Sequence, residues 1–220
     1  MGAESRPKGG RWPTTIIRRA MRLARSLIRF VELDPGQDIW TDVGRRQEAQ
    51  FDYEGRAIFD KNPIDGKAVR YSLSALWDDG RPILFGIGLN PSKARATTGD
   101  STVNRVLELA AREGYGGLFW TNLGGQMETN SRLFVSGGRQ AGSRNSEQLQ
   151  RVLGRLHPRE PARDVLIAWG WQGPTVATWL QRTAIDARVQ LHSVGPLIKG
   201  KPPHPQRYEG DLELLPLSRE

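Results

Sequence analysis

Four short segments carry the polar residues that could do chemistry, and each follows a run typical of a buried strand. They are GLNPSK (88–93), TNLGGQ (121–126), WGWQG (169–173) and KGKPPHP (199–205). They are stiffened by Gly or Pro, rich in hydrogen-bonding groups and poor in carboxylates, so they can orient water and bind a ligand but supply no strong base. Singly, each also resembles an ordinary turn or surface loop. Because open α/β sheets bind ligands beyond the carboxyl ends of their strands, we expect the four segments to share one site.

Asp100 is the one acid near the first segment. It stands in Gly99-Asp100-Ser101-Thr102, directly before a predicted helix over 102–113. A carboxylate at this position can cap the helix by accepting a backbone N–H. It can equally polarise a water molecule in a site. The sequence leaves both roles open.

Several other chemistries lack the residues they need. The chain has no Cys, and its three His residues are not spaced as metal ligands, so we expect no metal and no cofactor. Neither a G-x-S-x-G elbow nor a G-x-x-x-x-G-K-[ST] phosphate loop is present. Gly86-Ile87-Gly88 lies inside a strand and lacks the third glycine of a dinucleotide-binding loop.

The elements that would position these segments alternate between strands and helices. The predicted strands are 69–77, 82–89, 117–123, 164–169 and 189–194, and the predicted helices are 102–113, 146–156 and 175–185. This order is typical of an α/β fold with a mainly parallel sheet. Residues 35–67 are polar and weakly patterned, so we expect loops and short strands there, and the proline-rich tail over 195–220 is expected to be loop-like.

The positive charge of the chain is concentrated near its beginning. The net charge is +8, and residues 1–30 hold eight basic residues and one acidic residue. Residues 14–32 show helical spacing of apolar residues, which predicts an amphipathic helix with an arginine-rich face. We therefore divide the chain into a basic arm (1–34) and an α/β domain (35–220). The helix can pack on that domain, follow a phosphate backbone, or act as a membrane-surface or transit segment.

An ordered set of short motifs runs over about residues 70–215. The motifs are Leu89–Ser92 with Ala94, Asp100 with Thr102, Gly114–Gly117, Asn122-Leu123, Ala168–Gly170 and His204-Pro205. In this order they are similar to the core of a bacterial family of unknown function. That family in turn resembles the uracil-DNA glycosylase superfamily, whose mismatch-specific branch has a Gly-Ile-Asn-Pro loop similar to 88–91. The resemblance implies a three-layer α/β/α fold around a mainly parallel sheet.

The resemblance also implies roles for individual residues. Asn90 would position the attacking water, and Asn122 would contact a base flipped out of the duplex. The His204-Pro205 motif would wedge the duplex and stabilise the leaving base, although the usual serine-rich continuation is replaced by residues 206–208. The predicted catalytic residues are Asn90, Asp100 and His204. The predicted substrate-binding residues are Gly88, Leu89, Pro91, Ser92, Asn122, Trp169, Gly170 and Trp171, and the predicted DNA contacts are Arg18, Arg19, Arg22, Lys93, Lys199, Lys201 and Arg207.

The function that the resemblance implies is a monofunctional DNA glycosylase in the bacterial cytoplasm. Its expected substrate is a modified cytosine in duplex DNA, for example the glucosylated hydroxymethylcytosine of a phage, and its expected role is phage defence. We expect no membrane association and no obligate protein partner. Two alternatives stay open, namely a non-catalytic DNA-binding module that recognises a modified base and an N-glycosidase acting on free nucleosides.

Overall fold

The computed structural model describes residues 40–47, 52–61, 68–128, 130, 145, 149–150, 164–183 and 190–217. Within these ranges, no helix is long and apolar enough to cross a membrane. The predicted basic helix over 14–32 lies outside the described residues, and so do Arg18, Arg19 and Arg22. Of the predicted helix over 146–156, only residues 149–150 are described, and they are helical.

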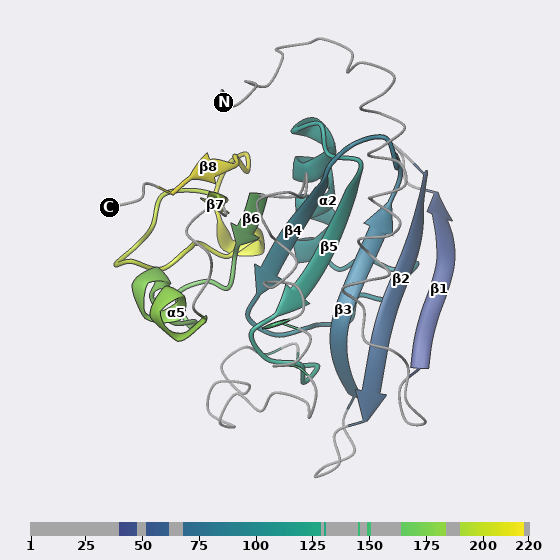
Figure 1. Ribbon diagram of the computed structural model, residues 1–220, viewed down its shortest axis with the longest axis horizontal. Helices are drawn as coiled ribbons and strands as arrows, with labels where there is room; N and C mark the ends of the chain where they lie inside the picture. Colours follow the sequence, from purple (N-terminus) through teal and green to yellow (C-terminus); the bar gives the residue numbers. More distant parts are fainter. Residues whose placement is uncertain are drawn as a thin grey trace.

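The described strands form one mixed sheet in the order β1-β2-β3-β5-β4-β6-β7-β8 (Figure 1). The strands are β1 (Trp40–Gln47), β2 (Asp52–Lys61), β3 (Ala68–Leu76), β4 (Ile83–Gly88), β5 (Gly117–Asn122), β6 (Asp164–Ile167), β7 (Gln190–Ser193) and β8 (Leu215–Pro216). Four strands, β5, β4, β6 and β7, run parallel to one another in the middle of the sheet. All other neighbouring strands are antiparallel. The α/β class is confirmed, but the sheet is mixed rather than mainly parallel.

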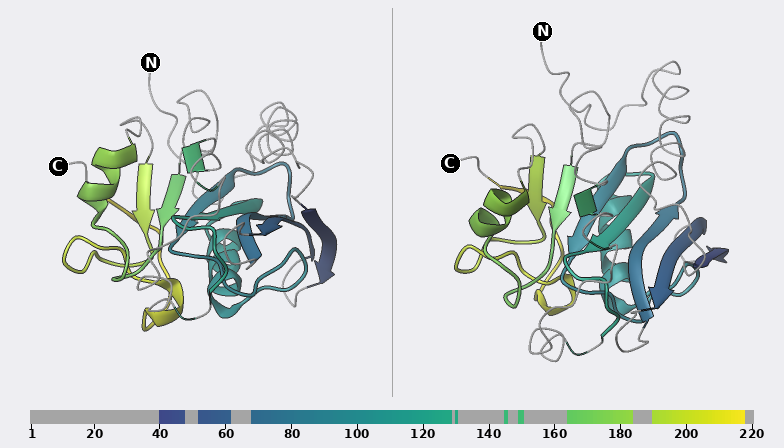
Figure 2. Two further views of the ribbon diagram at one scale, coloured as in Figure 1. Left: turned by 90° about the horizontal axis from the view of Figure 1, so that it is seen from below. Right: turned by 60° about the horizontal axis from the view of Figure 1, so that its bottom comes forward.

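The parallel strands have apolar side chains on both faces, as their continuous apolar runs predict. All six residues of β4 and all six of β5 are buried. One core cluster joins Leu84, Leu118 and Leu166 to helix α2 (Ser101–Arg112), and the other joins Phe85, Phe119 and Val165 to helix α5 (Val176–Thr183). The two helices therefore cover opposite faces of the parallel strands (Figure 2).

The first two described strands are longer than the sequence predicts. Residues 35–67 were expected to hold loops and short strands, yet β1 has 8 residues and β2 has 10, and the two pair along their whole length. One face of β2 presents four buried residues, Tyr53, Gly55, Ala57 and Phe59, and Ile58 and Asp60 on the other face are buried as well. Two of these four residues are small, so the period-2 pattern is present but its hydrophobic signal is weak.

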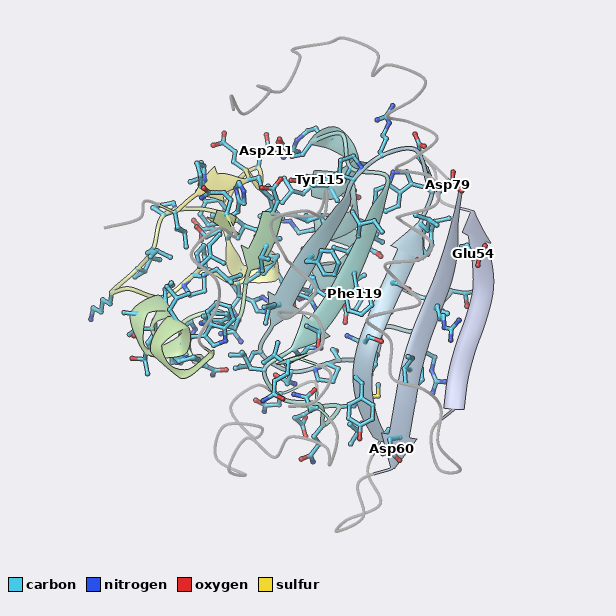
Figure 3. The ribbon with its side chains drawn as sticks, in the orientation of Figure 1. Glu54, Asp60, Asp79, Tyr115, Phe119 and Asp211 are labelled. Atoms are coloured by element: carbon cyan, nitrogen blue, oxygen red, sulfur yellow. The ribbon has the colours of Figure 1, made fainter. Side chains whose placement is uncertain are left out.

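The edge where the parallel strands begin is closed by a structural hydrogen-bond cluster. Tyr115 lies two residues before β5 at that edge (Figure 3), and its hydroxyl donates to Asp164 at the start of β6. The other oxygen of Asp164 lies 3.0 Å from His192 Nε2 on β7. These side chains tie the segment before β5 to strands β6 and β7 at the edge opposite to the predicted site.

Candidate active site

A cavity of about 260 Å³ lies at the carboxyl edge of the parallel strands. All three predicted catalytic residues line it, and so do most of the predicted substrate-binding residues. The predicted residues that line it are Gly88, Leu89, Asn90, Ser92, Asp100, Asn122, Trp169, Gly170, Trp171, His204 and Arg207. The lining does not include Pro91, Lys93, Lys199 or Lys201.

The Asn90 side chain is held in one orientation. Its Nδ2 donates to the carbonyl of Glu128 at 2.6 Å and to the carbonyl of Pro91 at 3.2 Å. Since an amide nitrogen has two N–H donors, both are in use. Within the described part of the chain Oδ1 makes no hydrogen bond, which leaves this oxygen as the acceptor that Asn90 offers.

Asp100 serves as a helix cap and also lines the cavity. Its Oδ1 accepts from the backbone N–H of Val103 at 2.9 Å, so it is the N-cap of α2. The capping role is therefore confirmed. Oδ2 makes no hydrogen bond to any residue the structure describes, so a carboxylate oxygen stays available at the cavity.

His204 is neutral at physiological pH and its tautomer follows from its contacts. Burial and the nearby charge of Arg207 lower the pKa of His204 from 6.5 to about 4, although Asp100 acts in the opposite direction. Its Nδ1 accepts the backbone N–H of Gln206 at 3.3 Å, at the start of the short 3₁₀ helix η1 (Pro205–Arg207). A neutral imidazole that accepts at Nδ1 carries its proton on Nε2, so His204 is a hydrogen-bond donor there.

Asn122 and Trp120 occupy space that two glycines of β4 leave open. Gly86 pairs with Trp120 and Gly88 pairs with Asn122 across the parallel strands. A Cβ on Gly86 would lie 2.3 Å from Cε3 of Trp120, and one on Gly88 would lie 2.7 Å from Oδ1 of Asn122. The Gly-Ile-Gly sequence therefore makes room for the side chains of the neighbouring strand at the cavity.

The two tryptophans after β6 have different environments. Trp169 lines the cavity but is only 1% exposed, and its indole packs 5.1 Å from that of Trp179 and donates to the carbonyl of Pro174. Its ring belongs to the core on the α5 face, so it offers little free surface for a base to stack on. Trp171 lines the cavity and is 53% exposed.

Arg70 is a buried cavity residue that the sequence did not predict, and Trp120, Glu128, Gln172 and Gln206 also line the cavity without having been predicted. In β3 alone, alternation would place Arg70 on the face opposite to Leu73. The pairing with β2 skips Tyr71, since Ile58 pairs with Ser72 and Phe59 with Arg70. This β-bulge turns Arg70 to the face of Phe59 and Leu73, where α2 and the cavity lie. No local sequence signal marks the bulge.

Of the predicted basic contacts that the structure describes, Arg207 lines the cavity, whereas Lys93, Lys199 and Lys201 do not. Lys93 is exposed, and Lys199 and Gly200, with φ of 52° and 70°, form a tight turn closed by hydrogen bonds between Ile198 and Lys201. These angles are typical of a type I′ turn. Lys201 Nζ donates to the carbonyl of Trp171 at 2.8 Å, which ties this turn to the cavity rim.

Arg105 of α2 holds the segment that carries His204. Its guanidinium donates to the carbonyls of Pro205 at 2.6 Å, Tyr208 at 3.0 Å and Gly210 at 2.6 Å. Arg112, two turns further along α2, donates to the carbonyl of Leu212. Helix α2 therefore connects the motif of Asp100, which caps it, to the His204-Pro205 motif, which Arg105 holds.

Fold and site together define an α/β protein with a small polar ligand cavity at the carboxyl edge of its parallel strands. Residues 70–206 match the model of the family described as protein of unknown function (DUF1643), and the chain belongs to this family. This agrees with the predicted membership of a family of unknown function.

The other comparisons give little further information. No curated protein matches the chain. Among solved structures, a Bacteroides fragilis protein provisionally described as an acetyl xylan esterase is similar at 12% sequence identity and a TM-score of 0.38. The alignment covers 87% of this chain, which spans 60% of the length of that protein.

Proposed function

We propose that the protein is a DNA glycosylase that hydrolyses the N-glycosidic bond of a modified cytosine and leaves an abasic site. The observation that carries the proposal is the orientation of the Asn90 amide. Its Nδ2 donates hydrogen bonds to two backbone carbonyls, so Oδ1 is the atom left to accept a hydrogen bond from water. The Asp100 carboxylate lines the same cavity.

This pair of groups fits the chemistry of glycosidic cleavage. As the bond from the sugar to the base breaks, positive charge develops on the sugar and negative charge on the base. Such a reaction is accelerated mainly by fixed charges and dipoles, and the attacking water needs orientation more than a strong base. Asn90 would orient the water through Oδ1, and Asp100 would stabilise the positive sugar.

The donors on the cavity fit the leaving base. His204 is neutral and carries a proton on Nε2, so it can donate a hydrogen bond to the base without bringing a positive charge. Asn122 is 1% exposed, and its Nδ2 has no hydrogen-bond partner in the described structure. A flipped base would supply the acceptor that this amide lacks.

The dimensions of the cavity favour a single base or nucleoside. Its volume of about 260 Å³ is just below the roughly 300–1,000 Å³ of typical small-molecule sites. The rim adds features that suit duplex DNA. Trp171 and Ile198 are the two large hydrophobic residues exposed in the described part of the chain, and Lys199, Lys201 and Arg207 accompany them. An aromatic ring beside positive charges is a common arrangement for binding DNA.

The finer assignments of fold and substrate belong to the same proposal. The parallel strands with α2 and α5 on opposite faces would correspond to the three-layer α/β/α fold of the uracil-DNA glycosylase superfamily, which the loop order resembles. That resemblance also suggests glucosylated hydroxymethylcytosine in phage DNA as the substrate. The protein would then act in phage defence in the bacterial cytoplasm.

The direct test is base release from defined DNA. The purified protein is incubated with duplexes containing uracil, a mismatch, hydroxymethylcytosine or glucosylated hydroxymethylcytosine, and free bases are identified by mass spectrometry. We expect release from at least one duplex and cleavage of the product strand by alkali. Asn90→Ala should abolish release, whereas the control Asn104→Ala, on α2 outside the cavity lining, should retain it.

The alternatives predict different outcomes. A DNA-binding module would bind DNA in a salt-dependent manner and release no base. A nucleoside N-glycosidase would release the base from free nucleosides but not from duplexes. Release that persists in Asn90→Ala would contradict the role given to Asn90.

A further inference from the structure

Arg70 is a buried cation that forms no salt bridge in the described structure, although the charge of Asp100 on the same cavity acts on it. The residue is 1% exposed and lines the cavity. Its Nη1 donates to the carbonyl of Ala94 at 2.6 Å, while its Nε has no hydrogen-bond partner. Arg70 forms no salt bridge with any residue in the described ranges. Burying a charged group is costly unless it is paired and hydrogen-bonded, so the free donor of Arg70 indicates a ligand that pairs with it.

Arg70 remains charged in this environment. Burial lowers the pKa of Arg70 from 12.5 to about 10, and the negative charge of Asp100 limits the shift. At neutral pH the guanidinium is therefore positive, close to the cavity and away from bulk water. In such surroundings its charge acts more strongly than it would in water.

A second buried donor lies on the neighbouring strand. Arg70 is on β3 and Asn122 is on β5, and these two strands pair through Leu73 and Trp120. The Nδ2 of Asn122 is also without a partner, and both residues line the same cavity. Two unpartnered buried donors on one cavity indicate a ligand that presents acceptor atoms to both.

We propose that Arg70 is a catalytic residue that binds the departing base and stabilises the negative charge that develops on it, with Asn122 as the second donor. This inference rests on the proposed glycosylase function and names the part of the substrate that the site recognises. A cytosine-type base offers O2 and N3 as neighbouring acceptors, and these atoms carry the charge when the base leaves as an anion.

The reaction balances with water as the only co-reactant. The bond between C1′ and N1 breaks, and its electron pair goes to the base. The oxygen of water forms a bond to C1′, and the proton that this water loses ends on the departed base by way of solvent. Asp100 and Arg70 then match the two developing charges, since the carboxylate stabilises the positive sugar and the guanidinium the negative base.

The test compares substrates whose bases differ in acidity. Single-turnover base release is measured for wild type, Arg70→Met and Arg70→Lys on duplexes whose cytosines differ at C5, including an electron-withdrawing fluorine. We expect Arg70→Met to lose about 100- to 1,000-fold in rate, as after removal of one oxyanion donor. The loss should be largest for the least acidic base, and Arg70→Lys should recover part of the rate. Arg95→Met, which removes an exposed charge one residue beyond Ala94, serves as the control.

A second measurement keeps the proposal testable if Arg70 variants do not fold. Binding of 5-nitrouracil to the wild-type protein is measured across the pH range in which this pyrimidine ionises. We expect the anion to bind at least about tenfold more tightly than the neutral form, and equal affinity would overturn the role of Arg70. Equal leaving-group dependence in wild type and a folded Arg70→Met would also overturn it. Absence of base release by the wild type on every duplex would instead overturn the proposed function, and the 5-nitrouracil result would still decide whether the cavity that Arg70 lines prefers an anionic base.

Discussion

Gly170, which follows β6, lies directly against His204, which precedes η1, and this contact fixes the position of the His204 side chain. Gly170 has a φ of +76°, and a Cβ at this position would lie 3.0 Å from the Cβ of His204. Both the backbone conformation and the close approach favour glycine. The two motifs are about 34 residues apart in the chain but form one wall of the cavity.

Gly170→Ala should therefore affect both stability and the site. We expect a loss of about 1–2 kcal/mol in unfolding free energy from the positive φ, together with slower base release because His204 is displaced. Gly210→Ala is a matched control, since Gly210 has a φ of +97° and no atom within 4 Å of its would-be Cβ. Denaturant unfolding should show a similar loss of stability in the two variants. Base release should be slower in Gly170→Ala alone. Equal rates in the two variants would argue against this contact.

Arg105→Met should disturb the His204 segment without touching the cavity. The variant loses hydrogen bonds to three carbonyls in residues 205–210. We expect it to lose about 1.5–3 kcal/mol in stability and to release base more slowly. Arg112→Met loses a bond of the same kind to Leu212, farther from the site. If Arg105 acts by positioning, the rate should fall only in the Arg105 variant, and a similar fall in both would indicate a general effect of destabilisation.

His204 should make stability depend on pH in a defined window. Burial, followed by the charge of Arg207, lowers the folded-state pKa of His204 to about 4, below its ordinary value of 6.5. Between these values the unfolded chain binds more protons, so stability falls as the pH falls from about 6.5 to about 4, by at most about 1.4 kcal/mol per pH unit. Thermal melts of wild type and His204→Gln from pH 4 to 7 check this, and the slope should be shallower in the variant. Parallel curves would contradict the lowered pKa.

Trp171→Ala should weaken DNA binding while leaving the fold intact. Its side chain is 53% exposed, so its removal opens no core cavity. If the indole stacks on a base, we expect the affinity for duplex DNA to fall by about 1–3 kcal/mol, with an unchanged melting temperature. Trp171→Phe should retain most of the affinity because it keeps an aromatic face. Fluorescence anisotropy with labelled duplexes measures the change, and equal affinity of all three proteins would remove Trp171 from the DNA contact.

The amino-acid sequence by itself determined the elements that carry the site. The continuous apolar runs of β4, β5 and β6 identify strands buried on both faces, and the helical spacing over 102–113 identifies α2. Asp100 as its N-cap was foreseeable because the capping bond is local. The gathering of Asn90, Asp100 and His204 also followed, because the carboxyl ends of parallel strands meet at one edge.

Only the tertiary structure decided which face and which depth each side chain occupies. The bulge opposite Ile58 and Phe59 turns Arg70 toward the cavity, and that register depends on pairing with another strand. Likewise, Trp169 is buried against Trp179 while Trp171, two residues later, is exposed. Such differences depend on packing between segments that are distant in the sequence, which local composition and spacing do not encode.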